Sequence, residues 1–134
     1  MNVSELEKEL ARDEGLRLKP YRDSVGKLSI GIGRNLDDKG ISEAEALMLL
    51  GNDITEHCAL LDKYLPWWRA LDEVRQRVVA NMAFNMGIGP STEQPTGKLL
   101  TFKNTLAAME RGDYEAAANG MSSSASSRRC WSRG

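Results

Sequence analysis

The chain has 134 residues, which is the size of one compact domain or of one domain with a small attached lobe. Apolar residues make up 41% of it and charged residues 28%, which is the composition of a soluble protein that can bury a core. With a formal net charge of −1, the whole chain lacks the excess of positive charge that marks a nucleic-acid or polyanion binder, and we expect no nucleic-acid partner.

The N-terminal sequence MNVSELEKEL lacks the basic and then apolar stretch of a secretory signal peptide. The longest apolar run, residues 46–50, is far shorter than a helix that spans a bilayer. We therefore expect synthesis in the cytoplasm without a signal peptide, and no stable insertion into a membrane.

The two cysteines, Cys58 and Cys130, form no metal-binding motif with the single histidine, His57. His57 and Cys58 are adjacent in a predicted helix, so their side chains point about 100° apart and do not readily share one ion. We interpret them as a surface histidine beside a core cysteine, and we expect no metal site.

The first predicted elements are a helix over residues 4–14 and an antiparallel hairpin. Ser4 and Glu7 have the spacing of a capping box, and Gly15 supplies the stop signal. Residues 27–32 follow a turn and alternate apolar with non-apolar side chains, which predicts a hairpin with one buried and one open face. Ser29 falls on the open face in this prediction.

Helices account for most of the remaining pattern, after a predicted turn at residues 37–40. Ser42 and Glu45 make a second capping box, for a helix that Pro66 ends. Residues 90–97 form a polar loop. Three more helices are predicted from apolar spacing: Leu71, Val74, Val78 and Met82 up to Gly87; Phe102, Leu106 and Met109 up to Gly112; and residues 114–119, closed by Gly120.

A helix, a small antiparallel sheet and then helices alone predict a mostly helical α+β fold. We expect one domain over residues 1–120, with a β lobe at about 16–40 and a helical lobe formed by residues 1–15 and 41–120. Residues 121–134 are rich in serine and arginine and carry no apolar period, so we expect them to form a disordered tail.

Glu14, Asp23 and Ser29 form a candidate catalytic set. Glu14 lies in the last turn of the first predicted helix, where the electronegative carbonyl end favours the protonated acid that general-acid catalysis requires. Asp23 precedes a tight turn, where water and backbone donors favour the ionised carboxylate, and Ser29 is close enough to share a water molecule with it. Two carboxyl groups in contrasting environments are the usual arrangement for glycoside hydrolysis, although helix-end Glu residues are commonly only solvated surface charges.

A specific motif surrounds this set and consists of residues 13–19, Tyr21, Asp23, Gly26 and residues 30–33. Three further blocks follow it, at residues 81–87, 101–106 and 114–119. The motif and the blocks, in this order along the chain, resemble the phage-type lysozymes, which are phage endolysins of glycoside hydrolase family 24. The resemblance covers about residues 5–120. That family has a Glu, an Asp nine positions later and a Thr six positions after that, and Glu14, Asp23 and Ser29 fall at the same spacing.

The resemblance implies a lysozyme-like bilobal fold and cleavage of the β-1,4 bond between N-acetylmuramic acid and N-acetylglucosamine in bacterial peptidoglycan, with inversion and no cofactor. Glu14 would be the general acid, and Asp23 with Ser29 would position the attacking water. The positions that match substrate-contacting residues of the family are Asn35, Phe84, Thr105 and Asn119. Phe84 has core packing as its alternative role, and Asn119 has helix capping.

The chain departs from the family pattern at several places. Ser29 stands where the family has Thr, and the lost methyl group leaves the hydroxyl freer to rotate. Arg34 replaces a histidine that pairs with a carboxylate of the other lobe. The tail lacks the helices that pack on the first helix, which suggests a truncated or frameshifted C-terminus. We expect a monomer, and a dimer if Leu6 and Leu10 are left without partners.

The leading hypothesis is a phage or prophage endolysin that reaches the cell wall through a membrane pore and lyses the host. The first alternative is a catalytically crippled remnant that folds marginally or only binds glycan. The second is a lytic transglycosylase, which needs only one acid and so leaves Asp23 unexplained. The third is a helical interaction module that catalyses no reaction.

Overall fold

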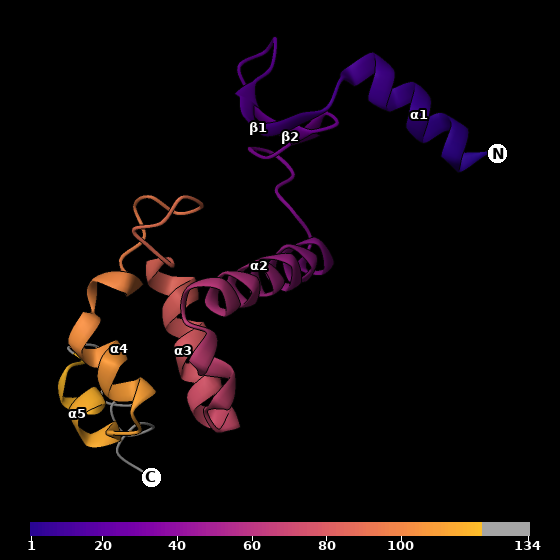
Figure 1. Ribbon diagram of the computed structural model, residues 1–134. Coiled ribbons are helices and arrows are strands. Elements are labelled where there is room, and N and C mark those ends of the chain that lie inside the picture. The colour runs from indigo at the N-terminus through magenta and orange to yellow at the C-terminus, as the bar shows by residue number, and fades with distance from the viewer. Residues whose placement is uncertain (122–134) are drawn as a thin grey trace. The chain divides into compact units, whose positions relative to one another are not determined.

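The computed structural model describes residues 1–121, and these residues form two compact units. The first unit is Met1–Met48, and the second begins at Leu49. Helices dominate the described residues, and the strands among them form one three-stranded antiparallel sheet in the order β1-β2-β3. Figure 1 shows β1 and β2 side by side. The prediction of a mostly helical α+β fold with a small antiparallel sheet is confirmed.

The first unit begins with helix α1 (Val3–Glu14), which ends at Gly15 as predicted. Its N-cap is Asn2, whose side chain accepts a hydrogen bond from the Glu5 amide, so the predicted cap at Ser4 is wrong. Asn is at least as good a cap as Ser, and the earlier start adds residues to the helix. None of the residues of α1 is buried.

The sheet consists of β1 (Arg17–Arg22), β2 (Leu28–Gly31) and β3 (Arg34–Asn35). Its hairpin confirms the prediction of strands on either side of a turn at residues 24–26, and Gly26 takes a positive φ of 83° there. The two-residue strand β3 was not predicted. It pairs with the free edge of β2, so that β2 becomes the middle strand.

Helix α2 (Glu43–Tyr64) begins at the predicted capping box. The Glu45 amide donates to the Ser42 hydroxyl at 3.1 Å, and the Ser42 amide donates to the Glu45 carboxylate at 2.9 Å. The helix ends before Pro66, as predicted, and a 3₁₀ helix, η1 (Pro66–Ala70), follows. None of the helices within residues 1–121 is long and apolar enough to cross a membrane.

The second unit holds the apolar core. Every buried apolar side chain in residues 1–121 lies between Leu60 and Met121. The elements after η1 are α3 (Glu73–Met86), the 3₁₀ helix η2 (Leu99–Thr101), α4 (Lys103–Glu110) and α5 (Tyr114–Asn119). The last two pack against each other (Figure 1).

The predicted apolar stripe of α3 is partly wrong. Val74 is 45% exposed, whereas Arg75 and Val79 are buried. The predicted stripe begins at Leu71, which precedes the Asp72 N-cap and lies outside the helix. Helical spacing measured from Leu71 therefore identifies the wrong face at the start of α3. Arg75 is buried because its guanidinium lies 3.7 Å from the centre of the Tyr114 ring and donates to Asp72.

The predicted loop at residues 90–97 is fastened by its own side chains. The Gln94 side-chain oxygen accepts from the buried Ile88 amide, and its nitrogen lies 3.3 Å from His57 of α2. The backbone folds back so closely that a Cβ added to Gly97 would lie 2.7 Å from the Gly89 nitrogen. Glycine is therefore required at this crossing.

The predicted domain bounds stay predictions. Met121, at the end of the described residues, is 4% exposed and belongs to the core, so the core reaches past the predicted end at residue 120. The predicted disordered tail otherwise falls on residues 122–134, outside the described residues. The assignment of residues 1–15 to a helical lobe stays a prediction, because α1 is described within the first unit.

Candidate active site

Glu14 is the last residue of α1, and its carboxylate lies over the turn that follows β2. The Gly15 amide closes the helix by donating to the Ala11 carbonyl at 3.0 Å, and Gly15 has a φ of 76°. A Cβ on Gly33 would lie 3.3 Å from the Glu14 Oε2 atom, so the glycine leaves room for this side chain. Within residues 1–121 the Glu14 carboxylate makes no hydrogen bond or ion pair, and the residue is exposed.

Asp23 follows β1 directly, and the backbone of the hairpin turn fixes its side chain. Its Oδ1 atom accepts from the Val25 amide at 3.0 Å and from the Lys27 amide at 2.9 Å. Its own amide donates to the Lys27 carbonyl at 2.9 Å. The two backbone amides therefore fix the orientation of the carboxylate, and its Oδ2 atom makes no hydrogen bond in the described part of the chain.

Ser29 lies in the middle of the sheet, opposite Tyr21 on β1 and Asn35 on β3. It is 3% exposed, so the prediction that it occupies an open face is wrong. The reason is β3, since a strand on each side of β2 places this small residue between larger neighbours. Its role in holding a water molecule stays a prediction.

Asn35, in β3, uses its side chain within the following turn. Its Oδ1 accepts from the Asp38 amide and its Nδ2 donates to the Asp38 carboxylate, both at 3.0 Å. Both polar ends of Asn35 are therefore engaged within the protein. A contact with substrate, as the resemblance implies, stays a prediction.

Phe84, Thr105 and Asn119 belong to the second unit. Phe84 is 43% exposed and its ring lies 5.4 Å from the His57 ring, so it is not plain core. Thr105 is buried in α4, and a Cβ on Gly120 would lie 2.2 Å from its hydroxyl oxygen. Asn119 is the exposed last residue of α5.

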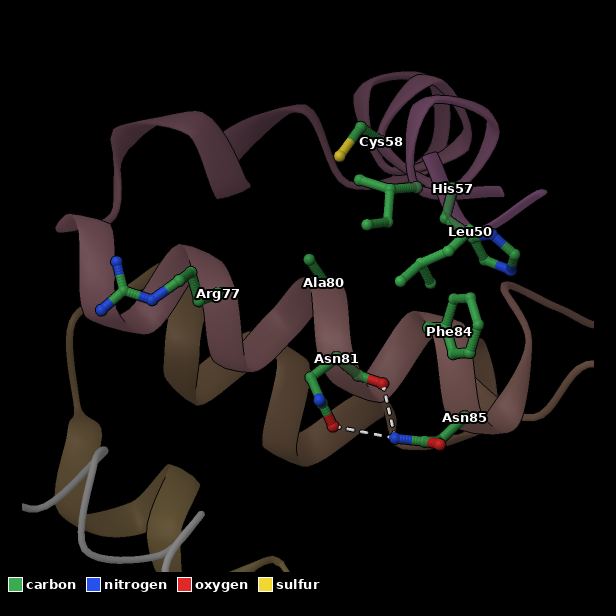
Figure 2. Close-up of a pocket in the computed structure, with 9 residues that line it drawn as sticks. Leu50, His57, Cys58, Arg77, Ala80, Asn81, Phe84 and Asn85 are labelled. Atoms are coloured by element: carbon green, nitrogen blue, oxygen red, sulfur yellow. Dashed lines mark hydrogen bonds between the residues drawn. The ribbon is translucent and has the colours of Figure 1, made fainter. Parts of the chain in front are cut away.

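Phe84 lines a cavity of about 600 Å³ between α2 and α3. Figure 2 shows Leu50 and His57 of α2 facing Phe84 across it, with Asn85 bonded to Asn81 at the α3 side. The lining is mainly apolar and contains no carboxylate. It therefore lacks the acid of a glycosidase, and the candidate catalytic groups lie in the first unit.

Two charged residues of the first unit, Arg34 and Asp37, have partners that the sequence pattern did not indicate. Arg34, which replaces a family histidine, donates to the Glu45 carboxylate at 2.8 Å and to the Gly40 carbonyl at 3.3 Å. The Arg34 guanidinium, together with the Ser42 backbone and hydroxyl, lowers the pKa of Glu45 to about 2. Asp37 accepts a bond from the Leu28 amide at 2.7 Å. The run Asp37-Asp38 indicated a turn and nothing more.

Within residues 1–121, no group of three or more His, Cys, Asp or Glu side chains could hold a metal ion. Cys58 is half-buried and makes no disulfide within the described part of the chain, and Cys130 lies outside it. His57 is half-buried rather than a surface residue, since its ring lies beside Phe84 and its Nδ1 faces the Asp53 carbonyl at 2.7 Å.

Comparison with known proteins matches the chain to a protein family and to a curated relative. The chain is 30% identical to the Pre-baseplate central spike protein Gp5 of Enterobacteria phage T4 over 145 aligned residues. That alignment covers 87% of this chain but only 23% of the relative. The model of the phage lysozyme family matches residues 11–129, a span that includes Glu14, Asp23 and Ser29. The chain therefore belongs to the phage lysozyme family.

Proposed function

We propose that this chain is a muramidase that hydrolyses the β-1,4 bond between N-acetylmuramic acid and N-acetylglucosamine in peptidoglycan. The observation that carries the proposal is the contrast between two carboxyl groups of the first unit. Glu14 is free of hydrogen bonds in the described chain, whereas two backbone amides hold one oxygen of Asp23. An exposed carboxyl group without bonds and a carboxyl group held in one orientation suit the two different roles in glycoside hydrolysis, the proton donor and the group that orients water.

In the proposed mechanism, Glu14 protonates the glycosidic oxygen as the bond to the sugar breaks. The free Oδ2 of Asp23 accepts a proton from the water that attacks the opposite face of the sugar, which inverts the anomeric carbon. Ser29 is the proposed second group that positions this water, together with Asp23. Asn35, Phe84, Thr105 and Asn119 remain the proposed substrate contacts, and no cofactor takes part.

The experiment is the clearance of purified peptidoglycan, with analysis of the released fragments. We expect the wild type to clear the suspension and to leave N-acetylmuramic acid at each new reducing end. Glu14→Gln should lower the rate by at least about a hundredfold, because the general acid is lost. Glu9→Gln is the matched control, since Glu9 is exposed on the same helix.

The outcomes separate the alternatives. Fragments that end in an anhydro ring would indicate a lytic transglycosylase instead. No clearance by a chain that still unfolds cooperatively would indicate a disarmed remnant. Equal clearance by wild type and Glu14→Gln would overturn the assignment of Glu14.

The biological setting has two candidates. The first is a phage or prophage endolysin, a monomer that waits in the cytoplasm and reaches the wall through a membrane pore to lyse the host. The second is a lysozyme domain of a phage particle, favoured by the similarity to a baseplate spike protein. Mass spectrometry of purified particles distinguishes them, because an endolysin should be absent from the particle and a spike component present in it.

A further inference from the structure

Two turns lie side by side in the first unit, and the second turn supports the first. The first turn, residues 23–27, holds Asp23. The second, residues 35–39, follows β3 and presents Asp37, whose Oδ2 accepts from the Leu28 amide at 2.7 Å. Arg22, which precedes the first turn, donates to the Gly26 carbonyl at 3.2 Å and lies 3.5 Å from the same Asp37 oxygen.

The peptide bond between Lys27 and Leu28 is the point where these contacts meet. Its carbonyl oxygen accepts from the Asp23 amide at 2.9 Å, and its N–H donates to Asp37. Both polar ends of this peptide plane are therefore fixed. The Lys27 N–H belongs to the preceding peptide plane, which shares the Lys27 Cα atom with this one, and it donates to the Asp23 carboxylate at 2.9 Å. Fixing one plane therefore restrains the other.

We propose that Asp37 is a positioning residue for Asp23, acting through the Lys27–Leu28 peptide. This inference rests on the proposed function in so far as it concerns catalysis. Asp37 is nine positions from Leu28 and touches neither Asp23 nor a reacting atom, so its effect must pass through the backbone of the turn. Loss of its carboxylate would free the peptide to rotate and loosen the amides that orient Asp23.

Asp37→Ala and Asp37→Asn separate the contact from the charge. Alanine removes the acceptor of the Leu28 amide, whereas the asparagine side-chain oxygen can still accept from it. The charge-matched control is Asp38→Ala, which removes a neighbouring carboxylate of the same turn. The Asp38 carboxylate contacts the side chains of Lys27 and Asn35 and not the Leu28 amide. Alanine retains the backbone amide that donates to Asn35.

Amide hydrogen exchange, followed by NMR in the full chain, tests the proposal without reference to activity. The informative amides are those of Val25 and Lys27, whose acceptor is Asp23. We expect both to exchange about tenfold faster in Asp37→Ala, and to keep nearly the wild-type rate in Asp37→Asn and Asp38→Ala. Unchanged exchange in Asp37→Ala would overturn the proposal.

Steady-state kinetics on peptidoglycan fragments test the catalytic consequence. We expect kcat to fall about tenfold in Asp37→Ala with little change in KM, and to recover in Asp37→Asn. In an Asp23→Asn background, Asp37→Ala should have no further effect, because both changes act on one group. If Asp37→Ala lowered kcat by the same factor in the Asp23→Asn background as in the wild type, the positioning role would be overturned. An inactive wild type would refute the proposed function, while the exchange result would still decide whether Asp37 orders Asp23.

Discussion

Arg34 and Glu45 form an ion pair at the start of α2. The Glu45 carboxylate accepts from Arg34 at 2.8 Å and from the Ser42 amide at 2.9 Å, and these bonds lower its pKa from an ordinary 4.5 to about 2. Since the folded-state pKa lies below the unfolded one, the pair stabilises the fold above about pH 4.5. This contribution is lost as the pH falls from about 4.5 to about 2.

Glu45→Gln should therefore destabilise the protein at neutral pH and not at low pH. Glutamine can keep the Ser42 contact of the capping box, so the change isolates the charge. We expect the difference in urea midpoint between wild type and variant to be constant above about pH 5 and to vanish near pH 2. The control is Glu43→Gln, on the same first turn. A difference that persists at pH 2 would contradict the assignment of the pKa shift to this pair.

At the scale of elements, local signals in the sequence predicted most of the helices. They also predicted that the two candidate carboxylates lie at a helix end and before a turn. Gly15 ends α1 and so places Glu14 at its last turn, and Ser42 and Glu45 cap α2. Asp23 was placed before a turn by its neighbours. These features depend on residues within four positions of one another, which a sequence pattern can capture.

Features that depend on contacts between elements could not be predicted. Ser29 is buried because β3 adds a third strand, and two residues are too few to show an alternating pattern. Arg75 is buried because Tyr114, far along the chain, covers its guanidinium. The contact between Asp37 and Leu28 needs two turns to meet, so the adjacent acids indicated only that the chain turns.

The loop at residues 90–97 gives a prediction at the same scale. Gln94 supplies the acceptor for the Ile88 amide, and Ile88 is fully buried. Gln94→Ala would leave that donor without its partner, which costs about 1–3 kcal/mol of unfolding free energy. Gln94→Glu keeps an acceptor and should lose less. Urea unfolding measures both, with exposed Thr96→Ala as control. If Gln94→Ala were no more destabilising than Thr96→Ala, the loop would not depend on this bond.

At the scale of the whole molecule, the core and the proposed chemistry lie in different units. The buried apolar side chains of the described chain begin at Leu60, whereas the only buried residue of Met1–Met48 is Ser29. Apolar burial is the main stabilising term in folding. The unit that carries Glu14 and Asp23 is therefore held mainly by hydrogen bonds, ion pairs and turns.

Hydrogen exchange followed by mass spectrometry should show this difference in the full chain. We expect amides of α1 and the sheet to exchange through openings of lower free energy than those of α3 and α4. A glycan fragment that binds the first unit should slow its exchange, because a ligand at a hundred times its Kd stabilises the bound form by about 2.7 kcal/mol. Glu14→Gln allows this measurement without turnover. The prediction would be contradicted if, before any ligand is added, the amides of residues 1–48 were as protected from exchange as those of α3. Such protection would require a core that the first unit lacks.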